Sequence, residues 1–372
     1  MTVTVRSFAK INLGLRIGPA REDGFHELLT VYQTIGLHDV IRVSVGRGTG
    51  TEIRCVDPGV PTDESNTCFR IVEKAKQSLQ LKELVVVEIE KRLPVQGGLG
   101  GASSNAVAAL LGLERAVRKE LPVAQKLRIA TEVGSDLPLF LIGGTVLGLG
   151  RGEQVYPLPD LPSRACVVLT PEVGISTPKA FAEWDRRTEE EHLRPPAQPW
   201  KSGASAPHQR GSGKGAPAPA LRKTDSSGTE PAEPKLTVSA ASDRINMLGR
   251  GLSAWLSKAF SGQSYSGAPS HFLGRRGRAE NPLLELVRAG IENDFEQVVF
   301  PEYPELGEGK RALLRAGAKY ASLSGSGSAL YGLFASKDAA ARAAARLRKQ
   351  GWSAQATATL PRRAYWRRMI AG

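Results

Sequence analysis

Apolar and polar residues alternate along several stretches of the chain, a pattern typical of half-buried β-strands. The alternation is longest over residues 2–17, which read TVTVRSFAKINLGLRI and place Lys10 within a mostly apolar strand. A buried apolar run predicts another strand at 164–171, RACVVLTP. Further strands are predicted at 40–46, 84–90, 319–323, 329–334 and 352–360, with a glycine-rich hairpin or strand pair at 143–152.

Apolar residues at helical spacing predict helices between these strands. In the segment 94–118, a glycine-rich loop precedes a helix, and the apolar face of that helix is formed by Ala106, Ala109, Leu110 and Leu113. Further helices are predicted at 66–79, at 126–134 with Gly134 as its end, and from a Ser336 cap to about Gln350. This mixture predicts an α+β protein, with an antiparallel sheet covered by helices in the second half.

The length and local composition predict how the chain is divided. Its 372 residues are enough for two domains, which we expect at 1–160 and 161–372. Between about 187 and 240, Pro, Gly, Ala, Ser and charged residues dominate. Such a segment cannot bury enough apolar surface to offset its ordering entropy, so we expect a long disordered, low-complexity insertion there. Residues 241–280 are ambiguous between an amphipathic helix and a loop.

The chain is basic, with a net charge of +13 and a pI of about 9.8. This charge could serve nucleic acid, or it could be a solvated surface that partly serves anionic substrates. Aromatic residues make up only 6% and are not interleaved with basic runs, so we expect no nucleic-acid partner. No run of 18 apolar residues predicts a membrane span. Three dispersed cysteines favour neither disulfides nor zinc and indicate a cytoplasmic location.

The glycine-rich loop is the first candidate for chemistry. Residues 94–105 read PVQGGLGGASSN and lead directly into the predicted helix. Free backbone N–H groups in such a loop, together with the positive end of the helix dipole, favour a bound phosphate. The loop is not a Walker A motif, because no Gly-Lys-Ser/Thr closes it. The alternative interpretation is a tight turn before a helix.

Three more segments give this loop a context: AKINLGL at 9–15, VGSDLPLFLIGG at 133–144 and ASLSGSGSAL at 321–330. In this order, the four segments resemble the signature segments of the GHMP kinases. The resemblance covers about residues 1–185 and 280–360. It implies a two-domain fold with a left-handed βαβ unit in the N-terminal domain, a ferredoxin-like C-terminal domain and an active site in the cleft between them.

Two further segments narrow the resemblance, GFHELLTVYQTIGLHD at 24–39 and STPKAF at 176–181. They are similar to the branch of the family that phosphorylates the 2-hydroxyl of 4-diphosphocytidyl-2-C-methyl-D-erythritol in the non-mevalonate isoprenoid pathway. This implies ATP and Mg²⁺ as cofactors and a small-molecule substrate. The alternatives are another GHMP kinase acting on mevalonate, a sugar or homoserine, and a non-catalytic basic binding protein on a decayed kinase fold.

The resemblance also assigns a catalytic pair. Asp136, in the Gly-Ser-Asp of the third segment, matches the base that accepts the proton of the attacking hydroxyl. Lys10 matches a lysine beside that acid, where a cation favours the ionised carboxylate and offsets phosphoryl charge. From the residues alone, Asp136 could equally be a helix cap or turn residue, and Lys10 an exposed residue on a strand edge.

The remaining assignments are also implied by the resemblance, and none of them is a metal ligand. The residues matched to ATP binding are Asn66, Lys91, Pro94, Gly97, Gly98, Leu99, Gly100, Gly101, Ala102, Ser103, Ser104 and Asn105. The residues matched to the substrate are Asn12, Phe25, His26 and Phe181, with the two phenylalanine rings on opposite faces of a cytosine and the histidine at its edge. The turn Gly325–Ser326–Gly327 is expected near the active site.

Overall fold

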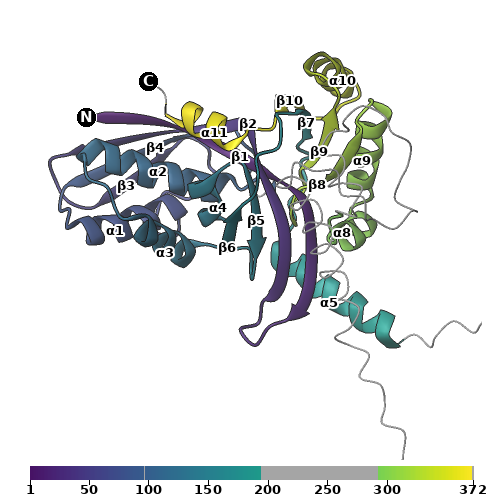
Figure 1. Ribbon diagram of the computed structural model, residues 1–372, viewed down its shortest axis with the longest axis horizontal. Coiled ribbons are helices and arrows are strands. Elements are labelled where there is room, and N and C mark those ends of the chain that lie inside the picture. Colours follow the sequence, from purple (N-terminus) through teal and green to yellow (C-terminus); the bar gives the residue numbers. More distant parts are fainter. Residues whose placement is uncertain (96, 194–291, 371–372) are drawn as a thin grey trace, which may run out of the picture.

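Two β-sheets, each with its own helices, organise the computed structural model, which describes residues 1–95, 97–193 and 292–370 (Figure 1). The expected insertion therefore lies almost entirely outside the described residues, as does the ambiguous segment 241–280. Of the expected insertion, only residues 187–193 are described, and they form the end of a helix. Among the described helices, none has the length and apolar character needed to span a membrane.

The first sheet is built around a long antiparallel hairpin of two strands, β1 (Thr2–Ala20) and β2 (His26–Gly46). The strands run in the order β3-β4-β2-β5-β6, with β1 paired to β2. The other four strands of this sheet are β3 (Thr51–Cys55), β4 (Leu84–Glu90), β5 (Thr145–Leu149) and β6 (Gln154–Pro157). Strands β3 and β4 are parallel and are linked by a helix, which makes a βαβ unit.

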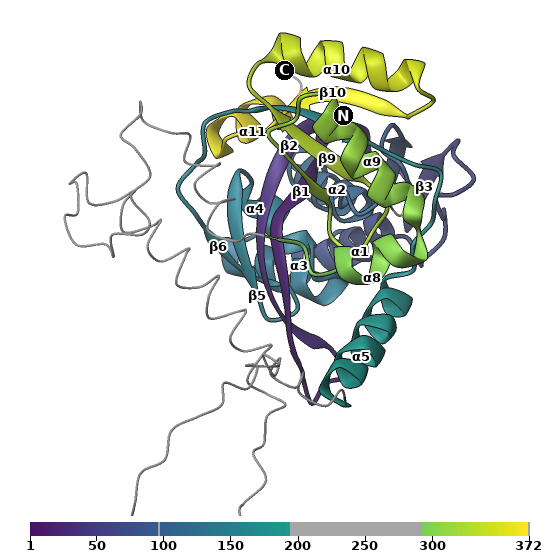
Figure 2. The same ribbon diagram turned by 90° about the vertical axis from the view of Figure 1, so that its right-hand side faces the viewer.

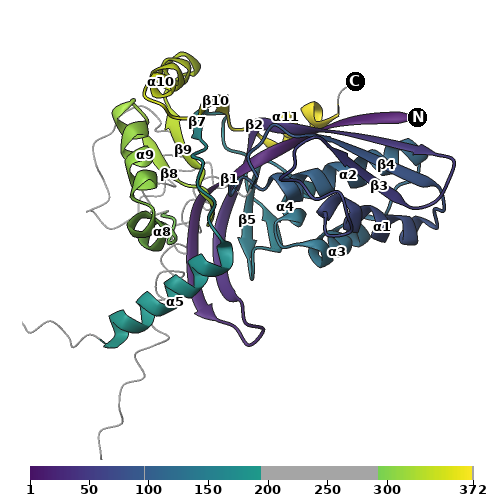
Figure 3. The ribbon, with the colours of Figure 1, turned by 180° about the vertical axis from the view of Figure 1, so that it is seen from behind.

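Four helices pack together on this sheet, as the views from the front and from behind show (Figures 1 and 3). They are α1 (Thr67–Leu79), α2 (Gly101–Val117), α3 (Val123–Val133) and α4 (Leu137–Ile142). Helix α2 is the central one, because residues 104–114 are buried on every side. The C-terminal helix α11 (Arg362–Met369) returns to the same core through the buried Tyr365 and Met369. Burial of this apolar surface fixes the position of α2 and of the loop before it.

The second sheet is antiparallel, with strand order β10-β7-β9-β8. Its strands are β7 (Ala165–Leu169), β8 (Tyr320–Leu323), β9 (Leu330–Phe334) and β10 (Ala354–Ala358). Its helices are α5 (Thr177–Leu193), α8 (Glu296–Glu302), α9 (Pro304–Arg315) and α10 (Lys337–Lys349), of which α9 and α10 lie along its outer side (Figure 2). Helices follow the first and third strands in chain order, which is the ferredoxin-like arrangement.

The α+β class and most of the expected elements are confirmed. Ser336 caps α10 by accepting a hydrogen bond from the Ala339 N–H, and Asn66 caps α1 by accepting one from Cys68. The expected strand at 40–46 was too short, since β2 begins at His26. Most of this added stretch is buried on both faces and so shows no alternation. The division at residue 160 stays a prediction.

Among the helices of the described residues, five were not expected from the sequence: α4, α5, α8, α9 and α11. Helices α4, α8 and α11 are only 6, 7 and 8 residues long, too short for a helical period to stand out. Helix α8 also carries Pro301 inside it. Packing against the two sheets, rather than local pattern, decides these segments.

Candidate active site

A cavity of about 590 Å³ is lined by residues of both halves of the chain. All residues predicted for the catalytic, ATP and substrate sites line it, with one exception. Ser104 is buried, and its hydroxyl donates to the Phe8 carbonyl at 2.7 Å rather than facing the cavity. The structure thus brings together segments more than 300 residues apart in sequence, from the first strand to Gly325 and Ser326.

Lys10 and Asp136 lie side by side in the lining of the cavity. The Lys10 ammonium is 3.5 Å from the Asp136 carboxylate and donates to the Asn12 carboxamide at 2.7 Å. Lys10 is only 3% exposed, which rules out the exposed-edge interpretation. Burial lowers the pKa of the Lys10 ammonium, and the charge of Asp136 partly opposes this shift. Asp136 sits at the N-cap position of α4 without capping it, so its carboxylate remains available to the cavity.

Tyr32 is a third member of this centre that the sequence did not indicate. Its hydroxyl donates to the second oxygen of Asp136 at 3.1 Å, and its ring lies 5.6 Å below the Lys10 ammonium. Burial, followed by the charge of Asp136, raises the pKa of Tyr32 well above its usual value. Tyr32 therefore stays protonated and acts as a fixed donor that orients the carboxylate. No local pattern could reveal this contact, because the two residues are 104 positions apart.

The glycine-rich loop lies beside this pair. Backbone contact joins the two elements, since the Lys10 N–H donates to the Leu99 carbonyl at 2.9 Å. Gly98 and Gly100 have φ angles of +77° and +70°, which glycine adopts without strain. Helix α2 begins immediately after the loop, and no side chain caps its first N–H groups. Free N–H groups at a helix start beside a lysine form a site suited to phosphate.

Asp39 binds two residues of the cavity lining, and the sequence did not single it out. Its fully buried carboxylate accepts hydrogen bonds from Lys91 at 2.7 Å and from Asn105 at 3.0 Å. The backbone N–H groups of Arg92 and Leu93 donate to its other oxygen. One buried acid therefore holds two residues matched to ATP binding. Each of these residues already uses one side-chain donor within the protein.

Aromatic side chains also line the cavity, among them Phe25 and Phe181. The His26 and Phe181 rings are stacked, with centroids 5.2 Å apart and planes 6° from parallel. Phe25 is 50% exposed, and the Arg151 guanidinium lies 4.8 Å from its ring centre. The two nitrogens of His26 contact the Gly18 carbonyl and Asp185, at 3.2 Å and 3.0 Å. Arg151 was missed from the sequence, as one basic residue in a glycine-rich hairpin.

Two family models match the chain. The GHMP kinases N terminal domain matches residues 66–144, and the GHMP kinases C terminal model matches residues 279–352. Solved structures show the same fold, including mevalonate kinase from L. major, with a TM-score of 0.61 and 13% identity over 96% of both chains. The fold and the site define this protein as a small-molecule kinase of the GHMP class.

Curated relatives narrow this class. A 4-diphosphocytidyl-2-C-methyl-D-erythritol kinase from Solibacter usitatus is 32% identical over 91% of this chain and 83% of its own length. The corresponding kinase from Geobacter sulfurreducens is 28% identical over 96% and 99%. A crystal structure of 4-(cytidine 5'-diphospho)-2C-methyl-D-erythritol kinase matches with a TM-score of 0.62 and 25% identity, over 96% of this chain and 98% of its own. The chain belongs to the family of 4-diphosphocytidyl-2-C-methyl-D-erythritol kinases.

Proposed function

We propose that this protein transfers the γ-phosphoryl group of ATP to the 2-hydroxyl of 4-diphosphocytidyl-2-C-methyl-D-erythritol. The carrying observation is the Lys10–Asp136 pair, which lines one cavity together with a phosphate-suited glycine loop and an aromatic pocket. A cytoplasmic location and the absence of nucleic-acid partners remain predictions from the sequence.

The residues support a direct transfer. Asp136 takes the proton of the 2-hydroxyl, whose oxygen forms a bond to the γ-phosphorus while the bond to the bridging oxygen breaks and ADP leaves. Lys10 supplies a fixed positive charge beside the transferred group, and its burial strengthens that charge's effect. Tyr32 holds the carboxylate in one orientation during the proton transfer.

The site fits a magnesium ion that arrives with ATP. The described residues contain no group of three or more His, Cys, Asp and Glu side chains that could hold a metal on their own. Mg²⁺ usually binds through phosphate oxygens, waters and one or two protein groups. In this cavity the protein group would be the Ser103 hydroxyl at the start of α2, which would bind the ion directly or through a water. The ion would neutralise charge on the phosphates when bound.

The aromatic pocket supports the cytidine part of the proposal. An exposed Phe25 ring and a Phe181 ring already backed by His26 offer faces on which a base could stack. The Arg151 guanidinium beside Phe25 would favour the diphosphate that follows the base. Three of the four residues that the resemblance assigned to the substrate, Phe25, His26 and Phe181, thus belong to this aromatic pocket, while Asn12 contacts Lys10.

A substrate panel tests the proposal. A coupled assay of ADP release with the cytidine diphosphate substrate, mevalonate, homoserine and sugars should show turnover only with the first.

Asp136→Asn, which is nearly isosteric, should reduce kcat by at least about 100-fold, the lower range for loss of a general base, while ADP still binds. Turnover of a different alcohol would redirect the proposal to another GHMP kinase, and wild-type kcat in folded Asp136→Asn would overturn the base.

A further inference from the structure

The short segment from Glu292 to Glu296 connects strand β1 to the second half of the molecule through hydrogen bonds. The Leu15 N–H donates to the Glu292 carbonyl and the Asp294 N–H donates to the Leu15 carbonyl, both at 2.9 Å. The buried Asp294 carboxylate accepts from Arg16 at 2.7 Å and from the Ile17 N–H at 2.9 Å. The segment is therefore anchored on β1, a few residues beyond Lys10 and Asn12.

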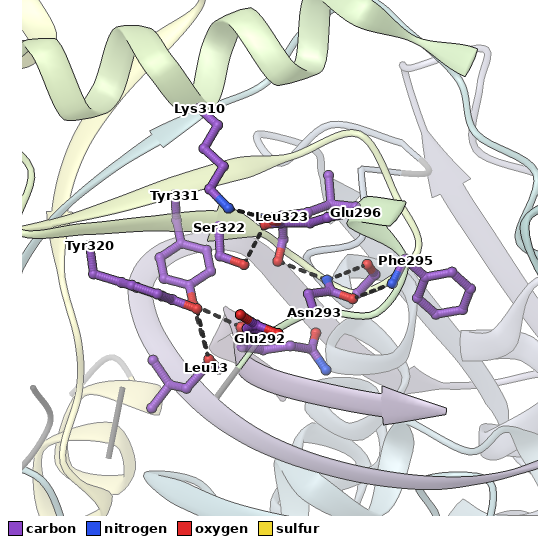
Figure 4. Close-up of polar contacts among 12 residues, drawn as sticks. Leu13, Glu292, Asn293, Phe295, Glu296, Lys310, Tyr320, Ser322, Leu323 and Tyr331 are labelled. Carbon is purple, nitrogen blue, oxygen red and sulfur yellow. Dashed lines mark hydrogen bonds and ion pairs between the residues drawn. The ribbon is translucent and has the colours of Figure 1, made fainter. Parts of the chain in front are cut away.

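Asn293 turns the other way, toward the second sheet (Figure 4). Its amide group donates to the Leu323 carbonyl at 3.0 Å and to the Gly325 carbonyl at 2.8 Å. Its side-chain oxygen accepts from the Phe295 N–H at 3.1 Å, and the residue is 2% exposed. One buried carboxamide thus satisfies two carbonyls at the end of β8, where the glycine turn begins.

This glycine turn contacts two parts of the proposed reaction centre, the Lys10–Asn12 pair and the glycine-rich loop. A Cβ placed on Gly325 would lie 3.3 Å from the Lys10 ammonium and 3.3 Å from the Asn12 carboxamide oxygen. On its other side, the Ser324 hydroxyl donates to the Gly98 carbonyl at 3.0 Å, and the Ala329 N–H donates to the Gly97 carbonyl at 3.0 Å. The turn therefore backs the catalytic lysine and the phosphate loop at the same time.

We propose that Asn293 is a positioning residue for phosphoryl transfer, an inference that rests on the proposed function. Its two N–H donors fix the Gly325 turn, and the turn fixes Lys10 and the glycine loop relative to each other. Without the carboxamide, two buried carbonyls lose their partners, and the turn shifts to find others. Small displacements between nucleophile, base and phosphate reduce the rate steeply, because transfer depends mostly on positioning.

Ser322 provides a matched control in the same network. Its hydroxyl donates to Glu296 at 2.7 Å, and Glu296 also accepts from the Leu323 N–H at 2.9 Å and pairs with Lys310. Ser322 is 1% exposed but does not line the cavity. Removing its hydroxyl costs a buried hydrogen bond of the same segment without freeing the carbonyl of Gly325.

The test compares Asn293→Ala and Ser322→Ala in the full-length protein. We expect Asn293→Ala to lower kcat by about 10- to 100-fold, the equivalent of losing one or two buried hydrogen bonds at the reaction centre, while each KM stays within about threefold. Ser322→Ala should keep kcat within about twofold with a similar fall in Tm. Hydrogen exchange of the peptide at 320–330 should rise more in Asn293→Ala.

If kcat is measured at a temperature well below the Tm of both variants and is equal in the two, Asn293 only stabilises the fold. If Asn293→Ala does not fold, Asn293→Asp keeps the size but replaces the donors with a carboxylate, and a kcat near wild type there would overturn the proposal. The exchange measurement needs no substrate. An inactive wild type would therefore refute the proposed function, while unchanged exchange at 320–330 in Asn293→Ala would refute the positioning role.

Discussion

A buried lysine needs a partner to remain charged, and in this site the partner is also the proposed base. The Lys10 ammonium is 3.5 Å from one oxygen of Asp136 and also donates to Asn12, while Tyr32 donates to the other oxygen of Asp136. Each carboxylate oxygen therefore has a different neighbour. This arrangement leaves Asp136 one-third exposed toward the cavity, where a substrate hydroxyl can approach it.

The lowered pKa of Lys10 predicts an alkaline limit to activity. As pH rises through this pKa, the ammonium loses its charge, so kcat/KM, which reports the groups of the free enzyme, should fall at a pH below the ordinary lysine value of 10.5. The unfolded chain binds this proton more tightly, so the contribution of Lys10 to the free energy of unfolding rises over the same window. The loss of kcat/KM is therefore not unfolding caused by this group.

A pH profile of kcat/KM for ATP measures this limit, with Lys10→Arg as the control that keeps the charge. We expect the control to have lower activity throughout but no alkaline fall up to pH 10.5. A wild-type profile that stays flat to pH 10.5, or an identical fall in Lys10→Arg, would exclude Lys10 as the titrating group.

The aromatic pocket gives a prediction about the base. Phe25→Ala should raise the KM for the cytidine substrate by roughly 5- to 150-fold, since stacking contributes about 1–3 kcal/mol per base. Phe181→Ala should do the same and also lower Tm, because Phe181 packs edge-on against Phe295 at 4.9 Å. Phe25→Trp, which keeps a stacking face, is the control. KM values for ATP should barely change, and a wild-type cytidine KM in both alanine variants would contradict a stacked base.

At the scale of elements, the glycine loop and the glycine turn fit against each other. A Cβ on Gly98 would lie 2.2 Å from the Ser324 carbonyl oxygen, and the φ angle of Gly98 is +77°. Gly327 is equally tight, since a Cβ there would meet the Gly98 nitrogen at 2.4 Å. One close backbone contact thus requires glycine in both segments, which are about 230 positions apart. Considered alone, either segment would look like an ordinary turn.

Gly98→Ala should therefore displace the loop and raise the KM for ATP at least about tenfold, with a lower kcat. Gly50→Ala is the matched control, because Gly50 has a φ of +96° but open space around its Cβ. Both substitutions carry the backbone cost of a positive φ, of the order of 1 kcal/mol, while only Gly98→Ala adds the overlap. Equal ATP affinity in the two variants would mean that the close contact with the turn does not shape the phosphate site.

On the scale of the whole molecule, the chain crosses between the two sheets more than once. Strand β1 carries Lys10 in the first sheet, yet its Asn12 carbonyl accepts a hydrogen bond from Tyr331 of the second sheet at 2.9 Å. Helix α11, at the end of the chain, packs on the first sheet, where the Tyr365 hydroxyl donates to the Phe140 carbonyl. These crossings bring residues of both halves to the reaction centre.

Two deletions distinguish segments that hold the molecule together from segments that do not. Deleting residues 196–235 should leave kcat and Tm nearly unchanged, because a composition this poor in large apolar residues adds little core.

Deleting residues 362–372 should lower Tm strongly, since it removes the fully buried Tyr365. Thermal melts and the coupled assay measure both effects. Loss of most activity in a folded 196–235 deletion would assign that segment a function.

The sequence by itself determined the α+β class, the glycine loop before α2 and the Ser336 cap, and its resemblance to the GHMP kinases pointed to Lys10 and Asp136, which the structure brings together. These features depend on local periodicity, on glycine and cap chemistry, and on motif order, all of which are written within short stretches. The aromatic residues Phe25 and Phe181 were also found in this way, through the segments that contain them.

Only the tertiary structure decided how these pieces meet. Tyr32 beside Asp136, Asp39 beneath Lys91 and Asn293 beneath the glycine turn are contacts between residues that are 104, 52 and about 30 positions apart. Local periodicity says which face of an element is buried, but it does not say which side chain of another element lies opposite. That pairing depends on strand register and on helix packing over the whole chain, so the side chains that orient the reaction centre emerge only once the two sheets are in place.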